Sequence, residues 1–310
     1  MVEDNEIKAQ VSPFAIREGE IKTFDGKDGY VSMNQIVHKI NIGHITDIHF
    51  AILDLVNEFE FITSRQLYQM LEIKGIDPKS QDKLNNKLDA LVKSKILTRY
   101  YFTSDEGKGI YRIYCLEKMG KYLLTSKEVE CKWQPSDNTK PVPMIKKRLA
   151  GNQVLIAYLR KVKAFDSYVV KPAITAKTLG KVFKATGGSV KLTKNGKSIQ
   201  FLFEVFRREM DWKKKLVEKM NLYKDFYENF QPGDSGFVSI PQLIFVCEDE
   251  KHMAECFREI VTNKVEIPQI KLLFTTDLRQ NKETLDETLV EFKLVDGKYK
   301  MEDVELKLLG

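Results

Sequence analysis

The chain has 310 residues, of which 43% are hydrophobic and 30% charged, and its formal net charge is +6. This length predicts two domains of ordinary size, each able to bury a core. No apolar run approaches the roughly 20 residues that cross a bilayer, and the N-terminal "MVEDNEIKAQ" is too acidic and polar for a secretory signal. The sequence therefore predicts a cytoplasmic protein and argues against secreted and membrane-inserted classes.

The charge is unevenly distributed along the chain. Residues 140–224 hold 21 Lys and Arg against 5 Asp and Glu, a net of +16. Residues 225–310 hold 10 against 18, a net of −8. A basic block of this size indicates a polyanionic partner for the middle of the chain, and a solvated lysine surface is the alternative interpretation.

Three helices and then a β-hairpin are expected after the first 43 residues. Apolar residues at helical spacing predict a helix over 45–59. Thr63, with Gln66 three positions later, forms a capping box, so a second helix should begin near Ser64. Ser80 is the expected N-cap of a third helix, which is followed by the strands "LTRYYFTS" and "GIYRIYCL". This order is that of a winged helix-turn-helix module.

The second half of the chain alternates between helices and apolar strands. A basic amphipathic helix begins at "KKRLAGNQV", a hairpin turns at Asn195 and Gly196, and "IQFLFEVF" is apolar on both faces, as a central strand is. The pattern predicts an α/β (mixed α+β) fold with a mixed sheet. The expected parts are an N-terminal arm, a winged helix, a polar linker and an α/β domain, at residues 1–43, 44–126, 127–145 and 146–310.

Candidate DNA contacts lie on the third helix, on the hairpin and in the basic block. If the helix turns its leucines inward, its opposite face suits the major groove; there Asn86 can pair with adenine and Lys83 can reach guanine or phosphate. The expected contacts are Lys79, Lys83, Asn86, Lys93, Arg99, Lys108, Arg112, Lys146, Lys147, Arg148, Arg207 and Arg208. Asp82 and Asp89 share the helix face and favour the alternative, a winged helix used for dimerisation or protein contact.

Glu204, within the central strand, is the candidate catalytic acid. Nucleases on such sheets need clustered carboxylates that hold Mg²⁺, and often a lysine. Here Phe206 occupies the position of the lysine in a (D/E)-x-K motif, and Asp166 is the only acid between residues 140 and 203. We therefore expect no catalysis; an active site would have to use Glu204, Asp166 and Lys215. The four cysteines show no zinc-ligand spacing with a histidine, so no metal or other cofactor is expected.

The stretch "FLFEVFRREMDWKKKLVEKMNLYKDFY" resembles the core signature of the replication-relaxation family. That signature is a buried strand ending in Glu-x-Asp-Arg, followed by a helix with lysine and tyrosine; the family's aspartate falls on Phe206. The matching residues are Glu204, Arg207, Lys215, Tyr223 and Tyr227. The resemblance, over roughly residues 44–280, implies a winged helix joined to a restriction-endonuclease-like domain, with a role in plasmid DNA replication or mobilisation.

The expected function is that of a non-enzymatic DNA-binding protein of a plasmid, integrative element or phage. Its expected partner is double-stranded DNA, with a relaxase or replication protein and a second copy of the chain as further candidates. Two alternatives remain open. One is a metal-dependent nuclease that recruits Glu204, Glu209 and Asp211, and the other is a winged-helix transcriptional regulator.

Overall fold

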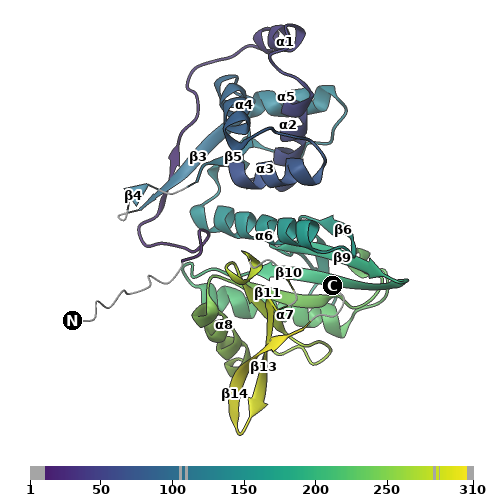
Figure 1. The fold of residues 1–310 in the computed structure, drawn as a ribbon. Coiled ribbons are helices and arrows are strands. Elements are labelled where there is room, and N and C mark those ends of the chain that lie inside the picture. The colour runs from purple at the N-terminus through teal and green to yellow at the C-terminus, as the bar shows by residue number, and fades with distance from the viewer. Residues whose placement is uncertain (1–10, 105–106, 109–110, 282–283, 286, 306–310) are drawn as a thin grey trace, which may run out of the picture.

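The computed structural model describes residues 11–104, 107–108, 111–281, 284–285 and 287–305. Figure 1 shows a smaller helical unit stacked on a larger unit built around a sheet, with one long helix, α6 (Val142–Lys161), lying between them. The mixed α/β fold predicted from the sequence is confirmed. Among the described residues, no helix combines the length and the apolar character that a membrane span requires.

The smaller unit has the element order of a winged helix. Its helices and strands are α2 (Asp47–Phe59), β2 (Ile62–Thr63), α3 (Ser64–Ile73), α4 (Gln81–Lys93), β3 (Leu97–Ser104), β4 (Gly107–Lys108), β5 (Ile113–Leu116) and α5 (Lys118–Ser126). β3 and β5 form the antiparallel hairpin, and the two-residue β2 pairs with β5 as a third strand. The three predicted helices and the hairpin are therefore present in the predicted order.

Side-chain caps explain where the helices begin. Thr63 accepts a hydrogen bond from the backbone of Gln66, whose side chain accepts in return from the Thr63 backbone, so α3 starts with a complete capping box. Ser80 caps α4 by accepting from the Lys83 N–H. Leu84 and Leu88 then point into the core, as the helical spacing predicted.

The N-terminal region contributes regular structure that the sequence patterns did not reveal. β1 (Ile21–Phe24) adds an antiparallel edge strand to β3, and α1 (Met33–Asn41) follows it with a capping box at Ser32. The preceding residues run down to the larger unit (Figure 1). What we interpreted as an arm is thus partly a strand of the winged-helix sheet.

The larger unit is a seven-stranded mixed sheet in the order β14-β13-β12-β11-β10-β9-β6. β10, β11 and β12 run parallel, and the outer strands are antiparallel. The elements are η1 (Pro135–Thr139), β6 (Phe165–Val169), β7 (Ala173–Ala176), β8 (Lys181–Lys184), β9 (Gly188–Lys194), β10 (Lys197–Val205), α7 (Trp212–Glu228), η2 (Asp234–Gly236), β11 (Gln242–Cys247), α8 (Glu250–Thr262), β12 (Leu273–Thr276), η3 (Arg279–Asn281), β13 (Leu289–Val295) and β14 (Lys298–Val304).

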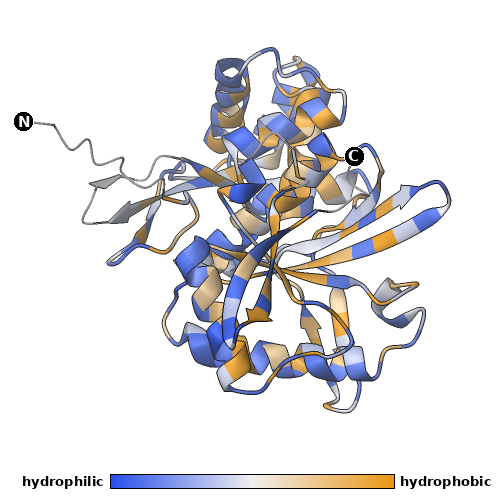
Figure 2. Ribbon diagram, turned by 60° about the horizontal axis from the view of Figure 1, so that its bottom comes forward, coloured by the Kyte–Doolittle hydropathy of each residue, from blue (hydrophilic) through white to orange (hydrophobic). Residues whose placement is uncertain are grey.

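Local turn chemistry predicted one hairpin of this sheet, while another was missed. Asn195 and Gly196 both have positive φ, 52° and 75°, and connect β9 to β10 as a two-residue turn. The β13–β14 hairpin has no counterpart in our sequence interpretation, because β14 is largely exposed and four of its seven residues are charged. Figure 2 shows apolar and hydrophilic residues alternating along strands of the sheet.

Side chains alternate between the two faces of the central strands, and this alternation separates two cores. Phe201, Phe203 and Val205 of β10 face α6, whereas Leu202 and Phe206 pack with α7 and α8 on the other face. A side chain at position 204 must therefore point toward α7.

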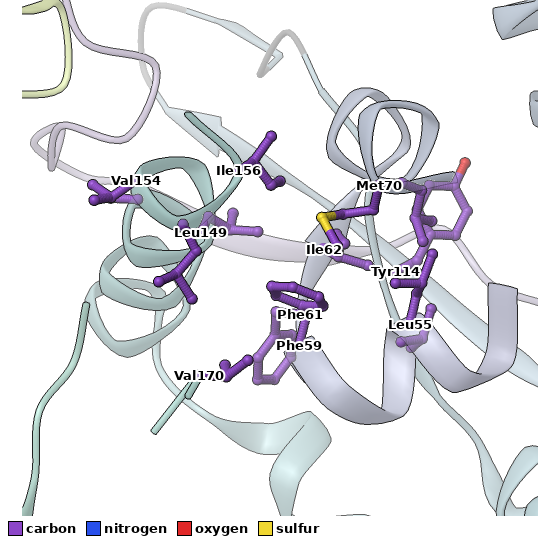
Figure 3. Close-up of a cluster of buried hydrophobic side chains, with 14 of the residues drawn as sticks. Leu55, Phe59, Phe61, Ile62, Met70, Tyr114, Leu149, Val154, Ile156 and Val170 are labelled. Atoms are coloured by element: carbon purple, nitrogen blue, oxygen red, sulfur yellow. The ribbon is translucent and has the colours of Figure 1, made fainter. Parts of the chain in front are cut away.

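α6 is covered on both sides. Twelve of its 20 residues are buried, more than the single apolar stripe of a surface helix provides. Figure 3 shows Leu149 of α6 close to Phe61 and Ile62, and a single core cluster continues from the winged-helix unit through α6 to the sheet. The helix begins at Val142, so the predicted linker boundary at residue 145 falls inside it.

A buried ion pair ties the N-terminal arm to α6. The Lys146 side chain is 1% exposed, contacts the Glu20 carboxylate and donates to the Ala15 carbonyl. Burial lowers the pKa of Lys146, and Glu20 opposes that shift. The ammonium therefore depends on its partner to remain charged inside the protein.

We expect Glu20→Ala to lower the free energy of unfolding by about 3–5 kcal/mol, because it leaves a buried ammonium without its counter-charge. Adding Lys146→Met to that variant should restore part of the loss. Urea denaturation of both single variants and the double variant measures this coupling. Lys132→Ala, which breaks an exposed pair with Glu130, is the control and should change stability by less than about 1 kcal/mol. Strictly additive effects of the two substitutions would contradict the pairing.

Candidate nucleic-acid interface

Glu204 lies in the middle of a hydrogen-bond network and is only 3% exposed. The Tyr223 hydroxyl donates to Oε2 at 2.6 Å, and the Thr186 hydroxyl donates to Oε1 at 2.7 Å. The Lys219 ammonium lies 3.4 Å from Oε2. Burial, followed by the negative charge of Glu204, raises the pKa of Tyr223 well above its usual value, so the phenol keeps the proton that it donates. Both oxygens of Glu204 are thus engaged by protein groups.

The other two residues of the expected catalytic set do not converge on Glu204. Phe165 is level with Ile199 and Ser167 with Gln200, so Asp166 lies between four and five residues from Glu204 in register. At about 3.3 Å per residue, roughly 15 Å separates the two along the strands alone. Asp166 is exposed and pairs with Lys191 at 2.7 Å.

Lys215 and Phe206 also serve other contacts. The Lys215 ammonium pairs with Glu209 at 2.9 Å and not with Glu204. Burial alone would raise the pKa of Glu209, but its hydrogen bonds from Lys147 and Lys215 lower it, so it remains an ionised partner. Phe206 is buried, with its ring edge-on to Phe245 at 5.0 Å between centroids. The lysine position of the nuclease motif is therefore part of the hydrophobic core.

Two arginines that we expected to contact DNA instead form ion pairs within the protein, at the carboxyl ends of the parallel strands. Arg207 is 1% exposed and donates to both oxygens of Asp277, at 2.8 and 3.0 Å, which corrects its assignment as a phosphate contact. Arg208 is partly exposed, and its guanidinium contacts Glu248, Asp249 and Glu255. Neither guanidinium is available to a polyanion without breaking these pairs.

The basic stretch at the start of α6 is also a correction. Lys146 and Arg148 are buried, the first against Glu20 and the second donating to the Val170 carbonyl at 2.9 Å. Lys147 is mostly covered and pairs with Glu209. Three consecutive cations gave the appearance of a phosphate-binding surface, but α6 is enclosed, so their partners come from within the chain.

The polar face of α4 has the exposure that a recognition helix needs. Lys83, Asn86 and Lys93 are exposed and take no part in the core. Lys79 precedes the helix with a φ of 71° and pairs with Asp77 at 2.9 Å in solvent. These four residues lie where the sequence placed them, on the side opposite the leucines.

The three hairpin residues that we expected to contact DNA differ in how exposed their side chains are. Arg99 is 13% exposed in its side chain, donates to Asp89 and contacts Asp25 at 2.9 Å, so it supports the hairpin and neutralises Asp89 on the α4 face. Arg112 is about half exposed and lies 3.2 Å from Asp25. Lys108 belongs to β4, but its side chain lies outside the described part of the structure.

A cleft of about 1050 Å³ separates the winged-helix unit from the end of α6. Its walls come from the start of α3, the start of α4, β3 and the return strand of the hairpin, the second half of α6, the loop after β12 and the N-terminal arm. Three cations of the cleft were not among the DNA contacts expected from the sequence, namely Arg65, Arg160 and Lys161. Arg65 lies at the start of α3 and the other two at the end of α6, and the packing of α6 against α3 brings them together.

Cys247, His252 and Cys256 form a buried cluster whose ligand atoms lie within 4.8 Å of one another, although their spacing had suggested no metal site. His252 Nδ1 accepts a hydrogen bond from the Glu248 N–H at 3.3 Å, and its Nε2 is buried without a hydrogen-bond partner among the described residues. The ring also lies edge-on to Trp212. The cluster joins the end of β11 to α8 within the core on that face of the sheet.

His252 predicts an acid-sensitive fold. Burial first, and then Arg208 and Arg207, lower its pKa to about 3; Asp249 opposes this and Lys147 adds to it. A depressed pKa means that the folded state binds the proton less well than the unfolded chain, whose His titrates near 6.5. This contribution to stability is complete above pH 6.5 and is lost as the pH falls toward 3.

We expect about 3 kcal/mol of this contribution to disappear between pH 7 and pH 4. His252→Gln should flatten the pH dependence of the free energy of unfolding by that amount, whereas substitution of the exposed His44 by Gln should leave it unchanged. Equal slopes for the wild type and His252→Gln, measured by urea denaturation at successive pH values, would show that His252 is not the titrating group.

Comparison with known proteins gives a family but no close relative. The chain resembles the restriction endonuclease FokI only weakly, with 10% identity and a TM-score of 0.25 over 75% of this chain and 42% of that one. The chain thus corresponds to less than half the length of that enzyme. None of the curated proteins compared with the chain matches it. The replication-relaxation model matches residues 53–240, from within α2 to just before β11 and therefore across both units, and the chain belongs to the replication-relaxation family.

Proposed function

We propose that the chain is a non-enzymatic, cytoplasmic DNA-binding protein that acts in replication, relaxation or mobilisation of a plasmid, integrative element or phage. The observation that carries this proposal is the polar face of α4, where Lys83, Asn86 and Lys93 are exposed and serve no packing role. Membership of the replication-relaxation family supports the biological setting.

α4 fits duplex DNA for geometric reasons. The major groove, about 12 Å wide, admits one α-helix, and the N-cap at Ser80 fixes where the first turn of α4 begins. Asn86 supplies the amide that pairs with adenine, while Lys83 and Lys93 supply charge for guanine or phosphate. Because Arg99 holds Asp89, only Asp82 of the two acids remains on this face without an ion pair among the described residues.

The exposed lysines of the basic block extend this surface onto the larger unit. With Lys146, Arg148 and Arg207 buried, the charge available to a polyanion comes from the β7–β8 hairpin, the β9–β10 turn and the start of α7. These exposed residues include Lys181, Lys184, Lys197 and Lys214. They suit sequence-independent phosphate contacts or an acidic surface of a relaxase or replication protein.

We expect Lys83→Ala with Asn86→Ala to weaken duplex binding at least tenfold, because each specific base contact is worth about 1–3 kcal/mol. The measurement is an electrophoretic mobility shift on DNA fragments from the neighbouring genes, repeated across a salt titration. Lys298→Ala, on the remote β14 strand, is the control that removes one exposed lysine elsewhere. Unchanged affinity of a folded α4 variant would rule out this helix as the DNA-reading element.

We further infer that the chain does not cleave DNA. A metal site needs at least two converging oxygen ligands, whereas Glu204 is engaged by Tyr223 and Thr186, and Asp166 lies at the far end of the strands. Of the alternative ligands, Glu209 is already held by Lys147 and Lys215. These observations favour Glu204 as a structural acid.

Supercoiled and linear DNA incubated with the protein in Mg²⁺ or Mn²⁺ should therefore remain intact. In parallel, Glu204→Ala should lower the free energy of unfolding by about 2–3 kcal/mol, since it leaves the buried Tyr223 hydroxyl without its acceptor. Metal-dependent nicking that disappears in a folded Glu204→Ala variant would instead make the nuclease the preferred function.

A transcriptional regulator is the second alternative, because a winged helix serves that role equally well. The two differ in where the DNA site lies. Binding beside a relaxase or replication-initiator gene favours the proposed function, whereas binding at a promoter, with altered transcript levels on deletion, favours the regulator.

A further inference from the structure

We propose that the cleft between the winged-helix unit and α6 holds an unpaired segment of DNA, beside the duplex bound by α4. This inference rests on the proposed function, since it assigns a second DNA site to the same protein. The protein would then prefer a junction between duplex and single strand to either form alone.

The cleft has the shape of a strand-binding site. Its volume of about 1050 Å³ is at the upper end of small-ligand pockets, which span about 300–1,000 Å³. It is concave, whereas the major groove of a duplex must be entered by a projecting element such as α4. A flexible single strand can follow a concave surface and turn its bases inward.

The charge of the cleft selects a polyanion. Four cations line it, namely Arg65, Arg112, Arg160 and Lys161, against a single acid, Asp277. Asp277 is buried and already bound by Arg207 and Ser12, so it does not neutralise the walls.

Two of the four cations, Arg65 and Arg160, are only weakly committed to other partners, whereas Arg112 pairs with Asp25 and Lys161 donates to the Gln280 carbonyl. Arg65 is exposed and forms no ion pair with any described residue. Arg160 is 45% exposed and reaches Glu72 only at 3.8 Å. Exposed pairs of this kind are worth little, so phosphates can replace them at small cost.

Amide side chains give the cleft groups that suit exposed base edges. Gln81, Asn85 and Gln153 lie on its walls, and each amide offers both a donor and an acceptor. Gln81 donates to Asn85 Oδ1 at 3.2 Å, and Gln153 Oε1 accepts from Gln66 at 3.3 Å, both bonds that a base edge can replace. Unpaired bases expose donors and acceptors on their Watson–Crick edges, which duplex DNA hides, so these amides favour a single strand.

The two proposed sites adjoin along α4. Gln81 and Asn85 line the cleft, whereas Lys83 and Asn86 are on the exposed face of the same helix. α4 therefore lies between a duplex on one side and the cleft on the other. A strand that leaves the duplex at this point would meet the cleft walls formed by the starts of α3 and α4 and the second half of α6.

The test is fluorescence anisotropy of the full chain with three labelled DNAs: a 12-nucleotide single strand, a blunt 20-base-pair duplex, and that duplex carrying the 12-nucleotide tail. The cleft variant is Arg65→Ala with Arg160→Ala. The α4 variant is Lys83→Ala with Asn86→Ala. Lys298→Ala with Lys300→Ala removes the same charge as the cleft variant from the remote β14 strand. Thermal unfolding of each variant establishes that it is folded.

The cleft variant should lose at least tenfold in affinity for the single strand and should no longer prefer the tailed duplex, while its affinity for the blunt duplex stays within twofold of wild type. Its salt dependence on the single strand should fall by about 1.4 log units per log unit of salt, at about 0.7 for each phosphate contact removed. The β14 variant should match the wild type on all three DNAs.

Three results would overturn the inference: no binding of the single strand by the wild type, wild-type affinity in the cleft variant, or an equal loss on the blunt duplex, which would make the cleft part of the duplex footprint. The first two leave the proposed function intact, because blunt-duplex binding is measured separately. Failure of the blunt duplex to bind, with the single strand still held, would remove the α4 assignment and keep the cleft.

Discussion

The enclosure of α6 is the constraint on which the arrangement of the molecule depends. One side of the helix packs against α3 and β2, the other against β9 and β10, so a single core crosses from the winged helix to the sheet. At Gly151 an added Cβ would lie 2.6 Å from the Thr186 carbonyl oxygen, which shows how closely the helix approaches the sheet. Interfaces this apolar leave little freedom for two units to move, and the cleft beside α6 therefore has fixed walls.

Burial of a helix that carries charge forces the chain to supply partners. A lone charge inside a protein costs several kcal/mol, so Lys146 requires Glu20, and Arg148 requires the Val170 carbonyl with Glu60 nearby. The Lys146–Glu20 ion pair fixes the N-terminal arm against α6. From there the arm reaches the loop after β12, where Ser12 donates to Asp277, and its residues close one wall of the cleft. The sign and position of the charges in α6 thus determine a surface far from them in sequence.

Features set by neighbouring residues could be predicted from the sequence, and features set by distant contacts could not. The capping box at Thr63 and the turn at Asn195 depend on residues within three positions, so the helix starts and the β9–β10 hairpin were predicted correctly. β1 forms because it can pair with the edge strand β3, and no pattern of neighbouring residues predicts that pairing. The same limit applies to the site. Arg207 was predicted to contact DNA from its charge alone, but it binds Asp277, which lies 70 residues later in the chain. Arg65 was not predicted as a site residue, because no residue near it in the sequence indicates the cleft.

The alternation of side chains on β10 bears on the proposal that the chain does not cleave DNA. Position 204 faces α7, while α6 and the cleft lie over the face that carries Phe203 and Val205. A strand in the cleft is therefore separated from Glu204 by the sheet itself, and a one-residue shift of register, which would reverse every side chain on β10, is excluded because both faces are buried. A lysine at position 206 would also lie on the α7 side. A nuclease needs its carboxylates and its DNA on the same side of the sheet. With a DNA strand in the cleft, as we propose, that strand and Glu204 lie on opposite sides, which supports the proposal that the chain does not cleave it.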